Sequence, residues 1–174
     1  MKIVLLGYMA SGKSVIGKAL AKKLHLKSID LDSYIEKKEK LSIAKIFETK
    51  GEIAFRMMEH AYLKEILFSN DKYILSVGGG TPCYAGNIDL ITNHSNSFYL
   101  KASIETLFNR ITNEKNKRPL VKDILHTNLK EFIAKHLFER NLFYNQASYL
   151  IDVNDKTIDE IVNSLTELIY LDKN

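Results

Sequence analysis

Apolar residues follow two alternating patterns along the chain. Short runs rich in branched and aromatic residues predict buried strands, and longer segments with apolar positions every three or four residues predict amphipathic helices. The predicted strands are 2–6, 27–29, 73–77, 97–101 and 149–153, and the predicted helices are 13–24, 31–38, 43–50, 52–68, 85–92, 103–111, 127–147 and 157–171. Strands alternating with helices imply a mainly parallel sheet covered on both faces, which is a three-layer α/β/α fold.

Residues 7–14, Gly-Tyr-Met-Ala-Ser-Gly-Lys-Ser, join the first strand to the first helix and fit the P-loop pattern G-x-x-x-x-G-K-[ST]. Backbone N–H groups of such a loop and the positive end of the following helix can surround a phosphate chain. Lys13 can reach the β- and γ-phosphates, and the Ser14 hydroxyl can ligate Mg²⁺. The expected nucleotide contacts in this segment are Gly7, Ala10, Ser11, Gly12, Lys13, Ser14 and Val15. The motif predicts ATP-type binding but does not identify the phosphate acceptor.

The composition is that of an ordinary globular protein. With 174 residues, 45% hydrophobic and 26% charged, the chain is expected to form a single domain over residues 1–174. Its apolar runs are far shorter than the roughly 20 residues of a membrane span, so we expect no membrane partner. The first strand begins at once, which predicts no signal or transit segment. A lone cysteine, Cys83, suits a reducing compartment, and we expect the cytoplasm.

The charge balance gives little sign of a nucleic-acid partner. The net charge is +4, from 25 basic and 21 acidic residues, and the basic residues are scattered. The run 37–40, Lys-Lys-Glu-Lys, mixes both signs and is typical of a solvated face. A mild positive balance also suits small anionic substrates. We therefore expect small-molecule ligands and no nucleic acid.

Several candidate residues follow directly after predicted strands. Gly7, Asp30, the glycines 78–80 and Asn154 all do so, and the carboxyl ends of parallel strands share one edge of a sheet. Asp30 and Asp32 point to the same side if the backbone between them is extended, and they could then serve Mg²⁺ and a hydroxyl group. The alternative is that one of them caps a helix.

Two further segments allow a structural or a functional interpretation. Glu52, Arg56 and Glu59 share one face of a predicted helix, either as a surface ion-pair ladder or as carboxylates that hold Arg56 rigid for an anion. Gly78, Gly79 and Gly80 form either a flexible turn or a site where a ligand approaches the backbone closely.

The polar segment 113–123 contains Arg118-Pro119-Leu120 and reads as a loop. Arg118 is either a solvated loop residue or an arginine that closes over the nucleotide. Arg110 and Arg140 lie on the flanking helices, where a surface role is the simplest interpretation of each alone. The five histidines and Cys83 show no zinc-ligand spacing.

Taken in order, these motifs resemble the shikimate kinase family, over almost the whole chain from residue 7 to about 154. The set comprises the P-loop at 7–14, Asp30-Leu-Asp32, Ser42-Ile43 with Ile46-Phe47, Gly51-Glu52 with Phe55-Arg56 and Glu59, Gly78-Gly79-Gly80, Arg110, Arg118-Pro119-Leu120, and Arg140 with Tyr144. The P-loop is shared by many families, whereas the other motifs in this order are far more specific.

The resemblance implies a P-loop NTPase fold of the nucleoside-monophosphate-kinase-like type, with a five-stranded parallel sheet. It also implies an acceptor-binding region at about 31–62 and a lid at about 112–124. For the nucleotide, it implies that Lys13 contacts phosphates, that Ser14 and Asp30 lie at the metal, and that Arg118 is the lid arginine. Arg110 would pack on adenine, with Asn154 in the adenine loop.

For the acceptor, the resemblance implies that Asp32 binds the hydroxyls and is the candidate base. Arg56 and Arg140 would hold the shikimate carboxylate, with Glu59 orienting Arg56. The remaining substrate contacts would come from the backbone of Gly78, Gly79 and Gly80 and from the apolar side chains of Ile43, Phe47 and Phe55.

Two segments depart from the family pattern. Ala10 stands where the family commonly has a third loop glycine, which leaves the loop less free. Thr81-Pro82-Cys83 is not the usual small-residue continuation after the glycines. The resemblance also implies that metal ligation near Ser76 passes through water, because Ser76 stands where many P-loop proteins carry an aspartate.

The resemblance predicts ATP-dependent phosphorylation of the shikimate 3-hydroxyl, a step of aromatic amino acid biosynthesis, by a monomeric enzyme that uses Mg²⁺. One alternative is a kinase of the same fold that acts on another hydroxylated acid such as gluconate. Another is a nucleotide-binding regulatory protein that has lost transfer. The presence of Lys13, Asp32 and Arg118 disfavours the regulatory protein.

Overall fold

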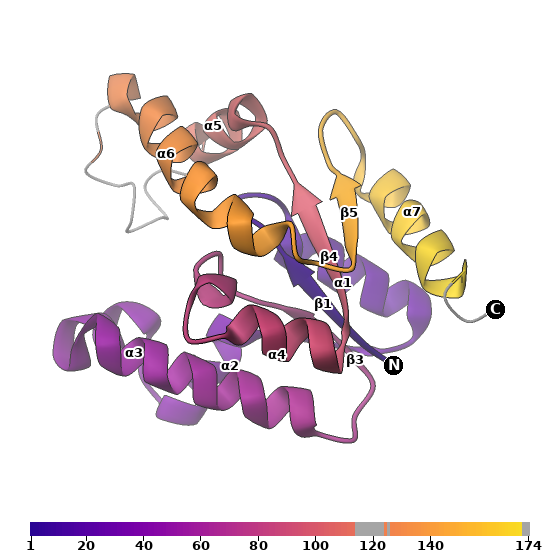
Figure 1. The fold of residues 1–174 in the computed structure, drawn as a ribbon, viewed down its shortest axis with the longest axis horizontal. Helices are drawn as coiled ribbons and strands as arrows, with labels where there is room; N and C mark the ends of the chain where they lie inside the picture. Colours follow the sequence, from indigo (N-terminus) through magenta and orange to yellow (C-terminus); the bar gives the residue numbers. More distant parts are fainter. Residues whose placement is uncertain (114–123, 125, 172–174) are drawn as a thin grey trace.

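The computed structural model describes residues 1–113, 124 and 126–171. These residues form a five-stranded, all-parallel sheet in the order β2-β3-β1-β4-β5 (Figure 1). The strands are β1 (Lys2–Leu6), β2 (Lys27–Asp30), β3 (Tyr73–Ser76), β4 (Asn96–Lys101) and β5 (Tyr149–Asp152). The helices are α1 (Lys13–Leu24), α2 (Leu31–Glu39), α3 (Ile43–Phe68), α4 (Asn87–His94), α5 (Ile104–Asn113), α6 (His126–Tyr144) and α7 (Ile158–Leu171), with a short 3₁₀ turn η1 (Thr81–Cys83).

The central strand β1 shows why both faces of the sheet are covered. Ile3 and Leu5 belong to one apolar cluster, which includes residues of α1 and α7, while Val4 and Leu6 belong to a second, which includes residues of α3 and α4. Successive side chains of a strand point to opposite faces, so an uninterrupted apolar run requires cover on both sides. Figure 1 shows α1 beside α7 and α3 beside α4. The predicted three-layer fold is confirmed.

The helix break predicted at Gly51 appears as a kink inside a single element. α3 runs from Ile43 to Phe68, but Gly51 has φ 79° and ψ 171°, outside the helical region. Glycine adopts positive φ without a Cβ clash, which explains the break. The helix begins as expected, because the Ser42 side chain accepts a hydrogen bond of 3.2 Å from the backbone N–H of Lys45.

The extended backbone considered for residues 30–32 is wrong. Asp30 ends β2 and caps α2, accepting a hydrogen bond of 3.3 Å from the N–H of Ser33, and Asp32 lies in the first turn of that helix. Carboxylates at the N-cap and in the first turn stabilise a helix, because they complement its unpaired N–H groups and its positive end. Capping by Asp30 therefore holds, and Asp32 reaches the site from a helix.

Other boundaries differ by a few residues. α4 begins at Asn87 instead of Ala85, because Ala85 and Gly86 adopt positive φ values of 46° and 71° in the preceding turn. α6 ends at Tyr144 instead of residue 147, and η1 was not predicted. Nearly all of the expected lid lies outside the described residues. Within the part of the chain that is described, no helix is both long and apolar enough to cross a membrane.

Candidate active site

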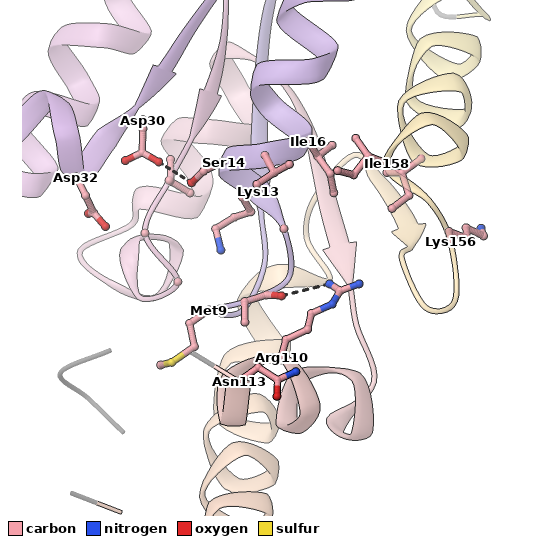
Figure 2. A pocket seen from close by; sticks show the side chains of 17 residues that line it. Met9, Lys13, Ser14, Ile16, Asp30, Asp32, Arg110, Asn113, Lys156 and Ile158 are labelled. Carbon is pink, nitrogen blue, oxygen red and sulfur yellow. Dashed lines mark hydrogen bonds between the residues drawn. The ribbon is translucent and has the colours of Figure 1, made fainter. Parts of the chain in front are cut away.

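A pocket of about 570 Å³ opens at the carboxyl edge of the sheet, beside the P-loop. Figure 2 shows side chains from distant parts of the sequence around it. Its walls are Met9, Ala10, Gly12, Lys13, Ser14, Val15, Ile16, Asp30, Asp32, Val77, Gly78, Gly79, Arg110, Asn113, Lys156, Ile158 and Ile161. Asp30, Gly78 and Gly79, which follow two of the predicted strands, therefore meet at the P-loop as predicted.

The backbone of the P-loop takes a sharply turned path. Gly7 and Gly12 have φ values of 145° and 101°, and a Cβ on Gly7 would lie 2.8 Å from the carbonyl oxygen of Leu100. Ala10 has φ 63°, in the left-handed region, which costs a non-glycine residue roughly 1–2 kcal/mol. The departure noted at Ala10 is therefore a position of backbone strain.

Lys13 is held against the loop that precedes it. Its Nζ donates hydrogen bonds to the carbonyl oxygens of Gly7 (2.8 Å) and Tyr8 (2.9 Å). In Figure 2 the ammonium group extends into the pocket, toward the side where Asp32 lies. A cation placed in this way suits the β- and γ-phosphates of a nucleotide.

Ser14 and Asp30 supply adjacent oxygen donors. The Ser14 hydroxyl donates a hydrogen bond of 2.7 Å to Asp30 Oδ2 (Figure 2). Mg²⁺ prefers such ligands and usually completes its shell with water and substrate phosphates. Among the described residues, no group of three or more His, Cys, Asp or Glu side chains could hold a metal. The chemistry of the two oxygen donors, a hydroxyl and a carboxylate, fits Mg²⁺.

The environment of Asp32 favours its neutral form. Partial enclosure in the pocket raises the pKa of Asp32 to about 6, and the nearby carboxylates of Asp30, Glu59 and Glu36 add to this, while Lys13 opposes it. The residue still has solvent-exposed surface, so water in the open pocket screens these charges. A carboxyl with a pKa near neutrality can exchange a proton with an alcohol substrate during reaction.

Arg110 lies at the other end of the pocket and contacts backbone from two elements. Its Nη1 donates to the carbonyl oxygens of Ala10 (3.2 Å) and Ser11 (3.4 Å), and its Nη2 to that of Val153 (3.5 Å). Figure 2 shows the bond to the loop. The expected contact with adenine remains a proposal, although Arg110 does line the pocket.

Asn154 was expected at the nucleotide but does not line the pocket. Its Oδ1 accepts hydrogen bonds from the Ser103 N–H (2.8 Å) and the Thr106 hydroxyl (2.9 Å), and its Nδ2 donates to Asp152 Oδ1 (2.9 Å). These bonds join the end of β5 to the start of α5. Lys156 and Ile158, two and four residues further on, line this end of the pocket instead.

Arg56 is fixed by a buried carboxylate. Its Nη1 lies 2.8 Å from Oε2 of Glu59, which is 1% exposed, whereas its Nη2 is 3.6 Å from the exposed Glu52. The hydroxyl of Thr81 donates a 2.6 Å hydrogen bond to the other Glu59 oxygen. A surface ladder does not describe this arrangement, since Glu59 is inside the protein. The structure matches the interpretation in which carboxylates hold Arg56 in place.

The three glycines allow charged side chains to converge on one turn. A Cβ on Gly78 would lie 3.4 Å from Asp32 Oδ1 and 3.2 Å from Glu59 Oε1. A Cβ on Gly79 would lie 3.5 Å from Arg140 Nη1, and one on Gly80 would lie 2.7 Å from Arg56 Nη2. None of the three has positive φ, so close packing, not an unusual turn, accounts for them. Two carboxylates and two guanidinium groups therefore converge on this turn, of which Gly78 and Gly79 line the pocket.

Apolar side chains lie next to Arg56. The rings of Phe47 and Phe55 are 4.6 Å apart between centroids, and Cζ of Arg56 lies 5.3 Å from the centroid of Phe55. Phe55 is buried, while Phe47 is 37% exposed and Ile43 is partly buried beside the same apolar cluster. Phe55 therefore lies beside the guanidinium group with Phe47 against it, and the predicted contact of these apolar side chains with an acceptor stays a proposal. Arg118, predicted as the lid arginine, lies outside the described residues.

Several contacts were missed by the sequence analysis. Met9, Asn113 and Lys156 line the pocket, and Thr81 binds Glu59. No sequence motif includes these residues as ligand contacts. Met9, Asn113 and Lys156 line the pocket because the fold brings the P-loop, the end of α5 and the segment after β5 to the same edge of the sheet. The departure at 81–83 did point to Thr81, because it drew attention to the segment after the glycines.

A strained glycine loop presents a lysine, and a carboxylate and two arginines from three different helices approach the neighbouring turn. Together with the parallel sheet, these features define a P-loop kinase of the nucleoside-monophosphate-kinase-like class. The family model described as "Shikimate kinase" matches residues 9–170. The chain belongs to the shikimate kinase family.

Individual relatives agree in sequence and in structure. A shikimate kinase of Flavobacterium johnsoniae is 48% identical over 169 residues, which cover 97% of this chain and 98% of that protein. The crystal structure of shikimate kinase from Bacteroides thetaiotaomicron superposes with a TM-score of 0.91 at 33% identity, covering 98% of both chains. A shikimate kinase from Acinetobacter baumannii, solved in complex with shikimate, gives a TM-score of 0.89 at 30% identity and covers 99% of this chain and 94% of that one.

Proposed function

We propose that the protein transfers the γ-phosphoryl group of ATP to the 3-hydroxyl of shikimate, giving 3-phosphoshikimate and ADP, as a step of aromatic amino acid biosynthesis. The observation that carries this proposal is the family match over residues 9–170. The site is consistent with it, because a phosphate loop, a carboxylate and two guanidinium groups meet at one pocket edge. The acceptor side would come from residues 31–62 together with the turn at 78–80 and α6.

The nucleotide would lie along the P-loop with its phosphates at the start of α1. Backbone N–H groups and the Lys13 ammonium would bind the β- and γ-phosphates. The base would extend toward Arg110, Asn113, Lys156 and Ile158, which line the far part of the pocket. Lys13 would exchange its hydrogen bonds with loop carbonyls for contacts with phosphate oxygens.

The acceptor would be oriented at its two ends. Arg56 and Arg140 would bind the carboxylate, since a planar guanidinium matches a carboxylate with paired hydrogen bonds. Asp32 would bind the hydroxyl that receives the phosphoryl group. Phe47 and Phe55 would contact the apolar face of the ring. A ring that lacks the carboxylate should then bind poorly.

The transfer step forms a bond between the acceptor oxygen and the γ-phosphorus and breaks the bond between that phosphorus and the β,γ-bridging oxygen. The electron pair of the broken bond goes to ADP, and the hydroxyl proton goes to Asp32. A loose transition state depends more on alignment and charge neutralisation than on a strong base. Lys13 supplies positive charge at the phosphates. Arg118 is proposed to do the same from the lid.

Three narrower expectations accompany the proposal. Ser14 and Asp30 would hold Mg²⁺, which when bound neutralises phosphate charge. A fourfold excess of EDTA over total metal should then abolish turnover, and added Mg²⁺ should restore it. We also propose a monomer located in the cytoplasm, the first testable by sedimentation and the second by cell fractionation.

The direct experiment measures ADP release with ATP in the presence of shikimate, of gluconate, or of no acceptor. We expect ADP at a rate that depends on shikimate, with the product identified by ³¹P NMR. Turnover with gluconate but not shikimate would favour the related sugar-acid kinase. Nucleotide binding without turnover on either acid would favour a regulatory protein.

A further inference from the structure

Tyr8, the second residue of the P-loop, contacts two different parts of the site. Its carbonyl oxygen accepts the 2.9 Å hydrogen bond from Lys13 Nζ. Its side chain is only 1% exposed, and Cζ of Arg140 lies over its ring, 5.4 Å from the centroid. One residue therefore adjoins both the cation that would reach the phosphates and the cation that would bind the acceptor carboxylate.

The surroundings of Tyr8 fix its ring. The hydroxyl lies 3.4 Å from Nδ1 of His136, which comes from α6, one turn before Arg140. Burial raises the pKa of Tyr8 to about 12, so the hydroxyl stays protonated at neutral pH. The ring is thus a neutral aromatic surface between the P-loop and α6.

Arg140 has a second close neighbour in the glycine turn. A Cβ on Gly79 would lie 3.5 Å from Nη1 of Arg140, and the Tyr144 hydroxyl donates a 2.5 Å hydrogen bond to the carbonyl oxygen of Gly79. The guanidinium group is therefore close to both an aromatic ring and a glycine turn. An arginine with few accessible rotamers loses less entropy when it binds an anion.

We propose that Tyr8 is a positioning residue that fixes Arg140 relative to the phosphate loop, and so sets where the acceptor carboxylate lies with respect to the transferred phosphoryl group. The attraction of a guanidinium to the face of an aromatic ring provides the physical link. The P-loop pattern leaves this position open to any residue, so the role comes from the fold of this chain. The inference rests on the proposed function, because it takes Arg140 as a ligand of the acceptor carboxylate.

Three variants of Tyr8 separate the aromatic face from other effects. Tyr8→Leu removes the ring, and we expect the KM for shikimate to rise about tenfold while the KM for ATP changes by less than about twofold. Tyr8→Phe keeps the ring and should hold the shikimate KM within about twofold of the wild type. If Tyr8→Leu fails to fold, Tyr8→Met tests the same point with an unbranched side chain.

Tyr73 provides a matched control. It is also fully buried, and its hydroxyl donates a 3.0 Å hydrogen bond to the carbonyl oxygen of Ile66, at the opposite end of the sheet from the pocket. Tyr73→Leu should lower the unfolding temperature without changing the ratio of the two KM values. If Tyr8 had a purely structural role, Tyr8→Leu would also leave the ratio of the shikimate KM to the ATP KM unchanged. We expect this ratio to change in Tyr8→Leu and not in Tyr73→Leu.

A double-mutant cycle with Arg140→Lys tests whether Tyr8 acts through Arg140. In that background we expect Tyr8→Leu to change the shikimate KM by less than about twofold, because the ring's target is already altered. Equal rises in both KM values, full additivity, or a Tyr8→Phe enzyme as impaired as Tyr8→Leu would overturn the role of Tyr8. Absence of shikimate-dependent ADP release by the wild type would instead overturn the proposed function.

Discussion

The ionisation of Asp32 should set the acid limb of the pH–rate profile. With a pKa of about 6, this carboxyl is only about one-tenth ionised at pH 5. At the ordinary value of 3.8 it would be more than nine-tenths ionised at the same pH. If ionised Asp32 accepts the hydroxyl proton, kcat/KM for shikimate at pH 5 should be about one-tenth of its plateau.

The sign of the effect follows from which form is active. Activity requires the carboxylate, so it is present above a pH of about 6 and falls as the pH drops through that value. The contribution of Asp32 to the free energy of unfolding depends on pH in the opposite direction. A raised pKa means that the folded protein favours the protonated carboxyl more than the unfolded chain does. That contribution is full below pH 3.8 and is lost as the pH rises through about 6. Activity and stability should therefore change in opposite directions over this interval.

The assay measures kcat/KM between pH 4.5 and 8 at constant ionic strength, with ADP quantified by direct chromatography. With ATP and shikimate both well below their KM values, the rate reports ionisations of the free enzyme, where no phosphates of bound ATP disturb Asp32. Circular dichroism at each pH checks that the protein stays folded. Burial and the charge of Arg140 also lower the pKa of His136, so a His136→Gln variant serves as control. The acid limb should persist in that variant.

A flat profile between pH 5 and 7 would refute the assignment of Asp32 as the group that must be ionised. So would an acid limb that disappears in His136→Gln. An acid limb near pH 4 would mean that solvent in the pocket restores the ordinary pKa of Asp32. A pKa near neutrality could then no longer explain how Asp32 accepts the hydroxyl proton.

Three other substitutions test the remaining parts of the site. Lys13→Met should lower kcat at least about a hundredfold by removing charge at the phosphates, which single-turnover chromatography can measure, and a kcat near wild type would contradict this. Arg56→Ala should raise the shikimate KM at least about tenfold and the ATP KM less than about twofold, whereas the surface control Lys45→Ala should change neither in steady-state kinetics. Ala10→Gly should stabilise the folded state by roughly 1–2 kcal/mol through relief of left-handed strain, and destabilise it by about 0.4–1 kcal/mol because glycine makes the unfolded chain more flexible. The free energy of unfolding in urea should therefore equal or exceed that of the wild type. A clear decrease would count against strain at Ala10.

The periodic part of the sequence was sufficient to predict the fold. The predicted strands 2–6 and 97–101 contain short apolar runs, residues 3–6 and 98–100, that are buried on both faces of the sheet. These runs therefore predict strands correctly without knowledge of their neighbours. The P-loop and the kink at Gly51 were also predictable, since each depends on glycine conformations that other residues reach only with strain.

Where the sequence allowed two interpretations, local structure decides between them. The sequence predicts a helix at 31–38 and allows either an extended pair of aspartates or a capping aspartate, and the structure shows that Asp30 caps the helix. For Gly78–Gly80 the sequence allows a turn or a close ligand approach. The structure adds that side chains pack against these glycines, and the ligand contact stays a prediction.

Contacts between distant residues were beyond the sequence. Tyr8 and Arg140 are separated by more than a hundred positions and belong to no shared pattern. The burial of Glu59 could not be told from its spacing to Arg56, because a surface ladder has the same spacing. The position of Arg140 beside Gly79 depends on where α6 crosses the sheet.

The strand order β2-β3-β1-β4-β5 divides the catalytic edge into two halves on either side of β1. Under the proposed function, one half, built by residues 30–80, would face the acceptor. The other half, built by residues 104–113 and 153–161, would face the nucleotide base. Substitutions in separate halves should act nearly additively, so the preference for a base could be redesigned without disturbing the acid that is phosphorylated. The acceptor specificity is harder to change. In the sequence, α6 lies between α5 and β5, on the side of the nucleotide base, but its Arg140 approaches Gly79 on the side of the acceptor. A new acceptor specificity would therefore require coordinated changes in two segments far apart in the gene.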